Sequence, residues 1–141
     1  MKRLRLVLFI FLVFAFTLAA VRFVSACPLE GNENTAYEIT FTDGKTVIYG
    51  CPHCGLEVHA TKKDRVKSAS ARDFISGEWM DPAKMFFIFN SAAIPACSPS
   101  WIAFGIKDDA EKFQKGFGGK IYTFDEALKE RGMEMKKKHQ H

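Results

Sequence analysis

The 141-residue chain lacks most of the patterns that identify a function directly. After residue 26 it has no apolar run long enough to cross a membrane, no heptad repeat and no glycine-rich loop of the kind that cradles phosphate. The pattern for haem attachment, Cys-x-x-Cys-His, is also missing, because Gly55 stands where that pattern requires histidine. A second Cys-x-x-Cys motif, which would complete a common type of zinc site, is not found.

The chain also lacks a surplus of charge once its beginning is set aside. Lys2, Arg3, Arg5 and Arg22 are four of the 20 basic residues, whereas none of the 16 acidic residues precedes residue 27. Residues 27–141 therefore carry 16 charges of each sign, and the net charge of +4 belongs to the first 26 residues. This balance gives no ground for expecting a nucleic-acid partner.

The first 26 residues have the character of a secretory signal peptide. A basic start is followed by an apolar run from Leu6 to Val21 and by small residues before a cleavage site. The run is short for a membrane span, which needs about 20 apolar residues. The segment from Val24 to Cys27 resembles a bacterial lipobox, so we expect lipidation of Cys27 and anchoring on the periplasmic side of a membrane. Ordinary cleavage after Ala26, or a retained anchor, is the alternative.

The most informative feature that is present is a pair of thiols three positions apart. The motif Cys51-Pro52-His53-Cys54-Gly55 comes directly after a short apolar run. Such a pair can hold a soft metal ion or exchange electrons as a dithiol and disulfide. If Cys27 is lipidated, the other three cysteines cannot all form disulfides within the chain, and metal binding by all three is the other possibility.

The first hypothesis for this motif is Cu(I) binding. Cu(I) is soft and prefers thiolate and thioether ligands, often only two or three of them. Cys51 and Cys54 lie one helical turn apart and can point at one ion, and a helix N-terminus favours their thiolates. We expect Cys97 to fold back as a third ligand, the alternative being a small buried apolar residue. His53 and His59 are candidates for direct or supporting contacts, although each fits a surface histidine better.

Two other functions fit parts of the same motif. The motif resembles the active site of DsbA-type thiol oxidases, in which Cys51 would be the nucleophile and Cys54 the resolving thiol. A structural zinc site would take Cys51, Cys54 and Cys97, with His53 or His59 completing the tetrahedron. The oxidase would make the protein an enzyme; the copper and zinc hypotheses would not.

The order of predicted elements indicates a small α+β domain over residues 37–130, preceded by a tether over residues 27–36 and followed by a polar tail over 131–141. The pattern hairpin–helix–strand occurs twice, over 37–75 and 85–124, which indicates an internal duplication. The expected elements are a hairpin of strands 37–41 and 46–49 turning at Asp43-Gly44, a helix from Pro52, strands at 71–75, 85–89, 101–106 and 120–124, a helix from an N-cap at Asp108 to Gly118, and a final helix from Asp125.

The second half of the chain resembles a known family. Between Phe86 and Leu128 it contains, in order, a strand ending in serine, an Ile-Pro loop, the segment Trp-Ile-Ala-Phe-Gly, a helix with Asp-Ala-Glu-Lys-Phe, and Phe-Gly-Gly-Lys-Ile-Tyr-Thr-Phe. These features are similar to those of NosL, the nitrous oxide reductase accessory protein family, over roughly residues 37–128. The resemblance implies a periplasmic lipoprotein of two similar βα units, related in fold to organomercurial lyase. It also implies binding of Cu(I) and its delivery to a copper enzyme.

The chain departs from the family pattern at the cysteines. Typical members carry Cys-Pro-x-Cys-Gly-Met near the mature N-terminus, but here only Cys27 and a proline stand there, and the motif from Cys51 to Gly55 follows the hairpin. Leu56 replaces the methionine of that motif. The usual Met-Gly after the loop proline is replaced by an alanine and Cys97. The family's ligand set therefore does not carry over whole.

Overall fold

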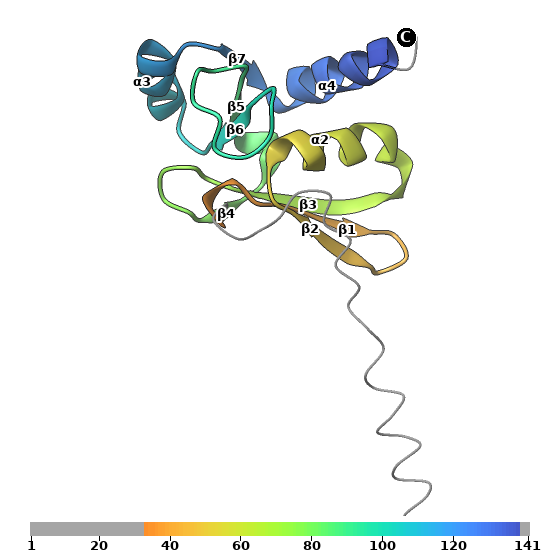
Figure 1. Cartoon of the computed structure of the whole chain (residues 1–141). Coiled ribbons are helices and arrows are strands. Elements are labelled where there is room, and N and C mark those ends of the chain that lie inside the picture. Colours follow the sequence, from red (N-terminus) through yellow and green to blue (C-terminus); the bar gives the residue numbers. More distant parts are fainter. Residues whose placement is uncertain (1–32, 139–141) are drawn as a thin grey trace, which may run out of the picture.

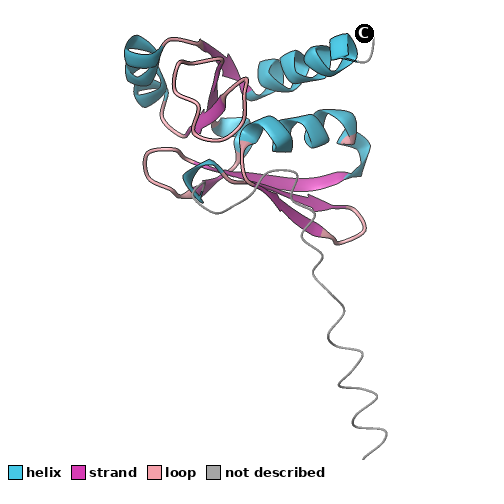
Figure 2. Cartoon of the chain, viewed as in Figure 1, coloured by secondary structure: helices cyan, strands magenta, loops and turns pink. Residues whose placement is uncertain are grey.

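The computed structural model describes residues 33–138, and within them the chain forms an α+β domain of two antiparallel sheets and helices (Figures 1 and 2). The expected signal peptide, the lipidation site Cys27 and most of the tether lie outside the described residues. In chain order the elements are η1 (Glu33–Thr35), β1 (Tyr37–Phe41), β2 (Thr46–Tyr49), α2 (Pro52–Thr61), η2 (Lys63–Arg65), β3 (Val66–Arg72), β4 (Trp79–Met80), η3 (Pro82–Lys84), β5 (Phe86–Phe89), β6 (Trp101–Phe104), α3 (Lys107–Phe117), β7 (Lys120–Thr123) and α4 (Phe124–Lys138).

The two halves of the domain share one topology. In the first half β1 and β2 form a hairpin, α2 follows, and β3 returns to pair with the other side of β1, giving the strand order β2-β1-β3-β4. In the second half β5 and β6 form the hairpin, α3 follows, and β7 pairs with β5, giving the order β6-β5-β7. In each half the first strand lies in the middle, so the predicted repeat of hairpin, helix and strand is confirmed.

Alternating side chains explain how the first sheet meets the core. Tyr37, Ile39 and Phe41 on β1 point inward and are buried, while the residues between them are partly exposed. Leu56 of α2 joins this core, as does Phe87 of β5, so one cluster of apolar side chains connects the two halves. Helix α2 lies between the first sheet and α4 (Figure 1). Within residues 33–138, no helix combines the length and apolar character needed to cross a bilayer.

Two elements in the middle of the chain, β3 and α3, differ most clearly from their predicted bounds, and β6 ends at Phe104, two residues earlier than predicted. The strand expected at 71–75 is β3, which begins at Val66 and ends at Arg72. The solvent-facing residues of β3 are polar, so its first half resembles a loop in the sequence. Pairing with β1 makes the segment a strand. Phe74 lies beyond the strand and packs against Phe113 of α3. Helix α3 begins one residue before Asp108, which lies in the first turn rather than at the N-cap.

The end of the chain also differs from the prediction. The final helix begins at Phe124 and continues to Lys138, beyond residue 130, where the domain was expected to end. The part of the expected tail up to Lys138 is therefore helical, and residues 139–141 lie outside the described part. Arg131, the first residue past the expected end of the domain, is only 1% exposed and is bonded to α2, so the packed part of the helix continues beyond residue 130.

Candidate metal centre

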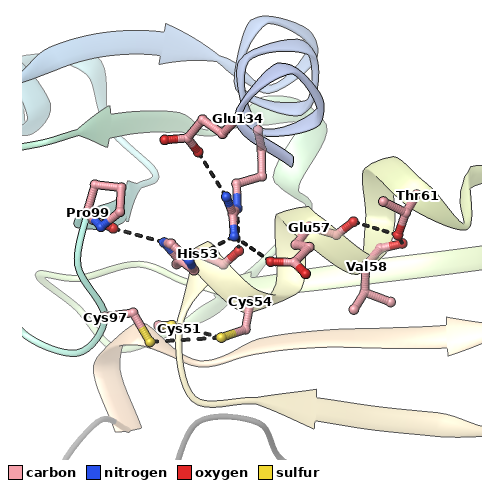
Figure 3. Close-up of polar contacts among 10 residues, drawn as sticks. Cys51, His53, Cys54, Glu57, Val58, Thr61, Cys97, Pro99 and Glu134 are labelled. Atoms are coloured by element: carbon pink, nitrogen blue, oxygen red, sulfur yellow. Dashed lines mark hydrogen bonds and ion pairs between the residues drawn. The ribbon is translucent and has the colours of Figure 1, made fainter. Parts of the chain in front are cut away.

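Three cysteine sulfur atoms lie together between the two halves of the fold (Figure 3). The Sγ atoms of Cys51 and Cys54 are 3.8 Å apart, those of Cys54 and Cys97 are 3.9 Å apart, and all three lie within 4.8 Å of one another. No disulfide joins these three residues to one another. The structure thus brings together the three cysteines that the sequence analysis selected, although 43 positions separate Cys54 from Cys97.

The start of α2 positions two of the three sulfur atoms. Cys51 stands at the N-cap of the helix and Pro52 at its first position, where the missing N–H of proline costs nothing. Gly55 faces Tyr37 of β1 so closely that a Cβ atom at this position would lie 2.4 Å from the tyrosine ring. The glycine therefore allows the first turn of the helix to approach the sheet, and this approach sets the place of Cys51 and Cys54.

The third sulfur atom comes from the loop between β5 and β6. This loop is fastened at both ends: the N–H of Asn90 donates to the Ser100 carbonyl at 2.9 Å, and the N–H of Ser91 donates to the Ser100 hydroxyl at 3.0 Å. The N–H of Ala92 donates to the carbonyl of Phe117, which ties the loop to the end of α3. These bonds return the chain across the start of α2 and bring Cys97 to the other two sulfur atoms.

Burial differs among the three cysteines. Cys51 is only 1% exposed, whereas Cys54 and Cys97 are partly exposed. The hydrogen bond between the sulfur atoms of Cys51 and Cys54 raises the pKa of Cys51, and burial raises this pKa further, so both effects favour the protonated thiol. A metal ion bound here would have to displace that proton. Cys51 is thus the most enclosed of the three cysteines, and Cys54 and Cys97 each keep part of their surface exposed.

His53 was expected at the surface, and this was wrong, because its side chain is buried. Its Nδ1 lies 2.9 Å from the carbonyl oxygen of Pro99 (Figure 3). Its Nε2 lies 2.8 Å from a guanidinium nitrogen of Arg131. A carbonyl can only accept and a guanidinium can only donate, so Nδ1 carries the proton and Nε2 is an acceptor. Burial lowers the pKa of His53 below 6.5, and the Arg131 charge lowers it further, against the raising effect of the bond to Pro99. Both ring nitrogens are therefore occupied by partners within the protein, and neither is available to bind a metal ion.

Arg131 is the residue of this region that sequence reasoning missed. Its guanidinium forms ion pairs with the carboxylates of Glu57 and Glu134, and its Nε donates to the His53 carbonyl at 3.1 Å. A signal was present in the sequence: Ala127, Leu128 and Arg131 recur at the spacing of one helix face, which puts the arginine on the side of α4 that faces the core.

His59 lies apart from the sulfur cluster. Its Nδ1 is 2.8 Å from the hydroxyl of Tyr37, and its ring packs edge-on against Phe124. Burial lowers its pKa below 6.5. His59 was expected at the surface but is half-buried between Tyr37 of β1 and Phe124 of α4.

The geometry bears on the two alternative functions. Among the described residues, the group whose donor atoms could hold one metal ion contains cysteines alone, so a histidine to complete a zinc tetrahedron is not brought there. A thiol oxidase needs an accessible nucleophile activated by its neighbours, but Cys51 is buried with a raised pKa. His53, which would stabilise the thiolate, is turned to Arg131 and Pro99 instead. Neither alternative gains support from the site.

Comparison with known proteins places this two-sheet α+β domain in a family. The model of the NosL family matches residues 57–131, more than half of the chain. The chain belongs to the NosL family. Its structure is similar to the crystal structure of the copper chaperone NosL from Shewanella denitrificans, with a TM-score of 0.54 and 22% identity over 64% of this chain and 75% of that chain. At this level of sequence identity, the structural similarity shows that the two proteins share a fold and nothing further.

The chain is also similar to part of a curated protein. The chain is 36% identical over 89 residues to the HTH-type transcriptional repressor CutR of Bacillus subtilis strain 168. The matched segment is 62% of this chain and 47% of that protein, so the chain spans about half the length of the curated relative that it matches.

Proposed function

We propose that this protein binds one Cu(I) ion through Cys51, Cys54 and Cys97 and passes it to a copper enzyme or to the machinery that matures one. The observation that carries the proposal is the sulfur cluster, in which three Sγ atoms lie within 4.8 Å of one another. Membership of the NosL family and the fold shared with a protein described as a copper chaperone support it. The copper ion is cargo, and the protein itself is not an enzyme.

The chemistry of the donor set favours Cu(I) over zinc. Three thiolates satisfy the low coordination number that soft Cu(I) accepts, whereas a structural zinc site is closed by four ligands. The sulfur atoms are already close, so a small contraction around an ion would complete a trigonal site. Such a site needs no ligand beyond the three cysteine side chains that the fold already brings together.

The uneven burial of the cysteines suits transfer by ligand exchange. A thiolate of the recipient would reach the ion from the side of Cys54 and Cys97, which are partly exposed. Cys51 is buried and would be the last ligand to be replaced. A stepwise exchange of this kind keeps the ion coordinated throughout the transfer.

The location and the recipient complete the proposal. We infer from the signal-like residues 1–26 and the lipobox-like segment ending at Cys27 that the protein acts on the periplasmic side, anchored to the membrane by a lipid. Nitrous oxide reductase is the recipient that the family name suggests, and delivery to it belongs to the proposal.

X-ray absorption at the copper edge tests the proposed ligands. The protein loaded anaerobically with one equivalent of Cu(I) is expected to show three sulfur neighbours, and the Cys97→Ser variant two. A first shell made of nitrogen donors, or a shell that Cys97→Ser leaves unchanged, would contradict the proposed ligand set.

A further inference from the structure

We propose that Arg131 and His53 act as positioning residues that hold the loop bearing Cys97 against α2, and so make the third thiol available to the metal. This inference rests on the proposed function, because it concerns the same sulfur cluster. Neither residue is proposed as a ligand. Each would act through the hydrogen bonds that connect α4, the start of α2 and the loop between β5 and β6.

A hydrogen bond connects His53 to the loop that bears Cys97. The Nδ1–H of His53 donates to the carbonyl of Pro99 at 2.9 Å. Pro99 is two residues from Cys97, closer along the chain than the anchors at Ser100 and Ala92. This bond therefore controls how near Cys97 comes to the sulfur atoms of α2, since His53 lies between the two cysteines of that helix.

Arg131 in turn fixes the orientation of the His53 imidazole. A neutral histidine can carry its proton on either nitrogen, and only the form protonated on Nδ1 can donate to Pro99. The guanidinium of Arg131 donates to Nε2 at 2.8 Å and thereby selects this form. Its Nε donates to the backbone carbonyl of the same histidine at 3.1 Å, so one side chain holds both the ring and the helix start.

The guanidinium of Arg131 is buried and held by two carboxylates. Arg131 is 1% exposed, and burying a cation is costly unless it is fully paired. Its charge is balanced by Glu57 of α2 and by Glu134 of α4. These carboxylates orient the guanidinium, as outer partners commonly orient the residues around metal ligands.

The test uses two variants of His53 that separate its ring nitrogens. In His53→Asn the amide nitrogen replaces Nδ1 and can still donate to Pro99. In His53→Gln the amide oxygen can take the place of Nε2 and accept from Arg131, so this variant keeps the contact with Arg131 and loses the bond to Pro99. Partner residues around metal sites are typically worth about 10–100-fold in affinity. His53→Gln is therefore expected to lower the Cu(I) affinity within this range, and His53→Asn by less.

Coupling to Cys97 distinguishes positioning from general destabilisation. If His53 acts through Cys97, the double variant His53→Gln/Cys97→Ser should bind Cu(I) no more weakly than Cys97→Ser alone. Additive losses in the double variant, or equal losses in His53→Asn and His53→Gln, would overturn the proposal. Arg131→Met is expected to weaken binding in the same coupled way. Lys129→Met, an exposed charge on the same helix, is the matched control.

A second readout separates this inference from the proposed function. In the metal-free reduced protein, release of the loop by His53→Gln should raise the rate at which iodoacetamide alkylates Cys97, with the rate at Cys54 unchanged. This result would support positioning even if the wild-type protein failed to bind Cu(I), in which case the proposed function alone would fall. An unchanged rate at Cys97 would overturn the positioning role.

Discussion

Replacing Gly55 with alanine should destabilise the protein, although alanine is the better helix former. The added Cβ would lie 2.4 Å from Cδ1 and Cγ of Tyr37 and 2.6 Å from its Cβ, where carbon atoms normally stay about 3.5–4.0 Å apart. The tyrosine is fully buried and its hydroxyl is bonded to His59, so the ring cannot turn away. The helix start would have to move by roughly 1 Å to restore normal contact.

The magnitude follows from two opposing terms. Overpacking of a core costs about 1–3 kcal/mol and occasionally more, while the change from glycine to alanine inside a helix returns at most about 1 kcal/mol. The clash involves three atoms, so the upper part of that cost applies, and the free energy of unfolding should fall by about 1–2 kcal/mol. The Cu(I) affinity should fall as well, because the first turn of α2 carries Cys51 and Cys54.

Urea unfolding followed by circular dichroism measures this change, with the same substitution elsewhere as the control. A Cβ at Gly116 or Gly132 would meet nothing within 4 Å, so Gly116→Ala and Gly132→Ala should each raise the free energy of unfolding by about 0.5–1 kcal/mol. Opposite signs for Gly55 and the controls are expected. A stabilising effect of Gly55→Ala would refute the close approach of helix and sheet.

Three further outcomes are expected. Arg131→Met should lower the free energy of unfolding, measured in urea, by about 2–4 kcal/mol. The reason is that the variant leaves two carboxylates and the acceptor Nε2 of His53 without their cationic partner. An effect no larger than that of Lys129→Met would contradict the buried network. Burial raises the pKa of Asp73, but hydrogen bonds from Gly105 and Ser76 outweigh this and hold its pKa below the ordinary 3.8. Its stabilising effect should therefore be complete above pH 3.8 and lost as the pH falls through the lower folded value, and Asp73→Asn should flatten this acid limb in thermal melts; an unchanged limb would count against these bonds. Gly118→Ala should destabilise the protein in urea, because this residue ends α3 with a φ of +68°, which disfavours a side chain; an unchanged midpoint would argue against that conformation.

Local patterns were enough to predict most of the fold and the members of the sulfur cluster. Pro52 after a strand indicated the helix start, and Gly118 indicated the end of α3. The repeated order of hairpin, helix and strand followed from short apolar runs and turn residues. The return of Cys97 to the motif was a hypothesis about ligands, and the structure places it there because the loop's ends are fixed at Ser91 and Ser100.

The parts that the sequence could not supply depend on contacts between distant residues. The burial of His53 requires both α4 and the loop at Pro99, and neither neighbour is visible in the motif itself. The start of β3 at Val66 is decided by pairing with β1, since its outward residues are as polar as those of a loop. The spacing of Ala127, Leu128 and Arg131 indicates the buried face of α4, but only the packing of α4 on α2 shows which distant groups hold the guanidinium.

Binding of Cu(I) by the cysteine cluster can be measured by an anaerobic titration of the reduced protein against a chromogenic Cu(I) chelator. We expect tight binding of one ion per chain, and loss of that binding in the Cys51→Ser/Cys54→Ser double variant. Weak binding by the wild-type protein, or tight binding that the double variant retains, would contradict this expectation.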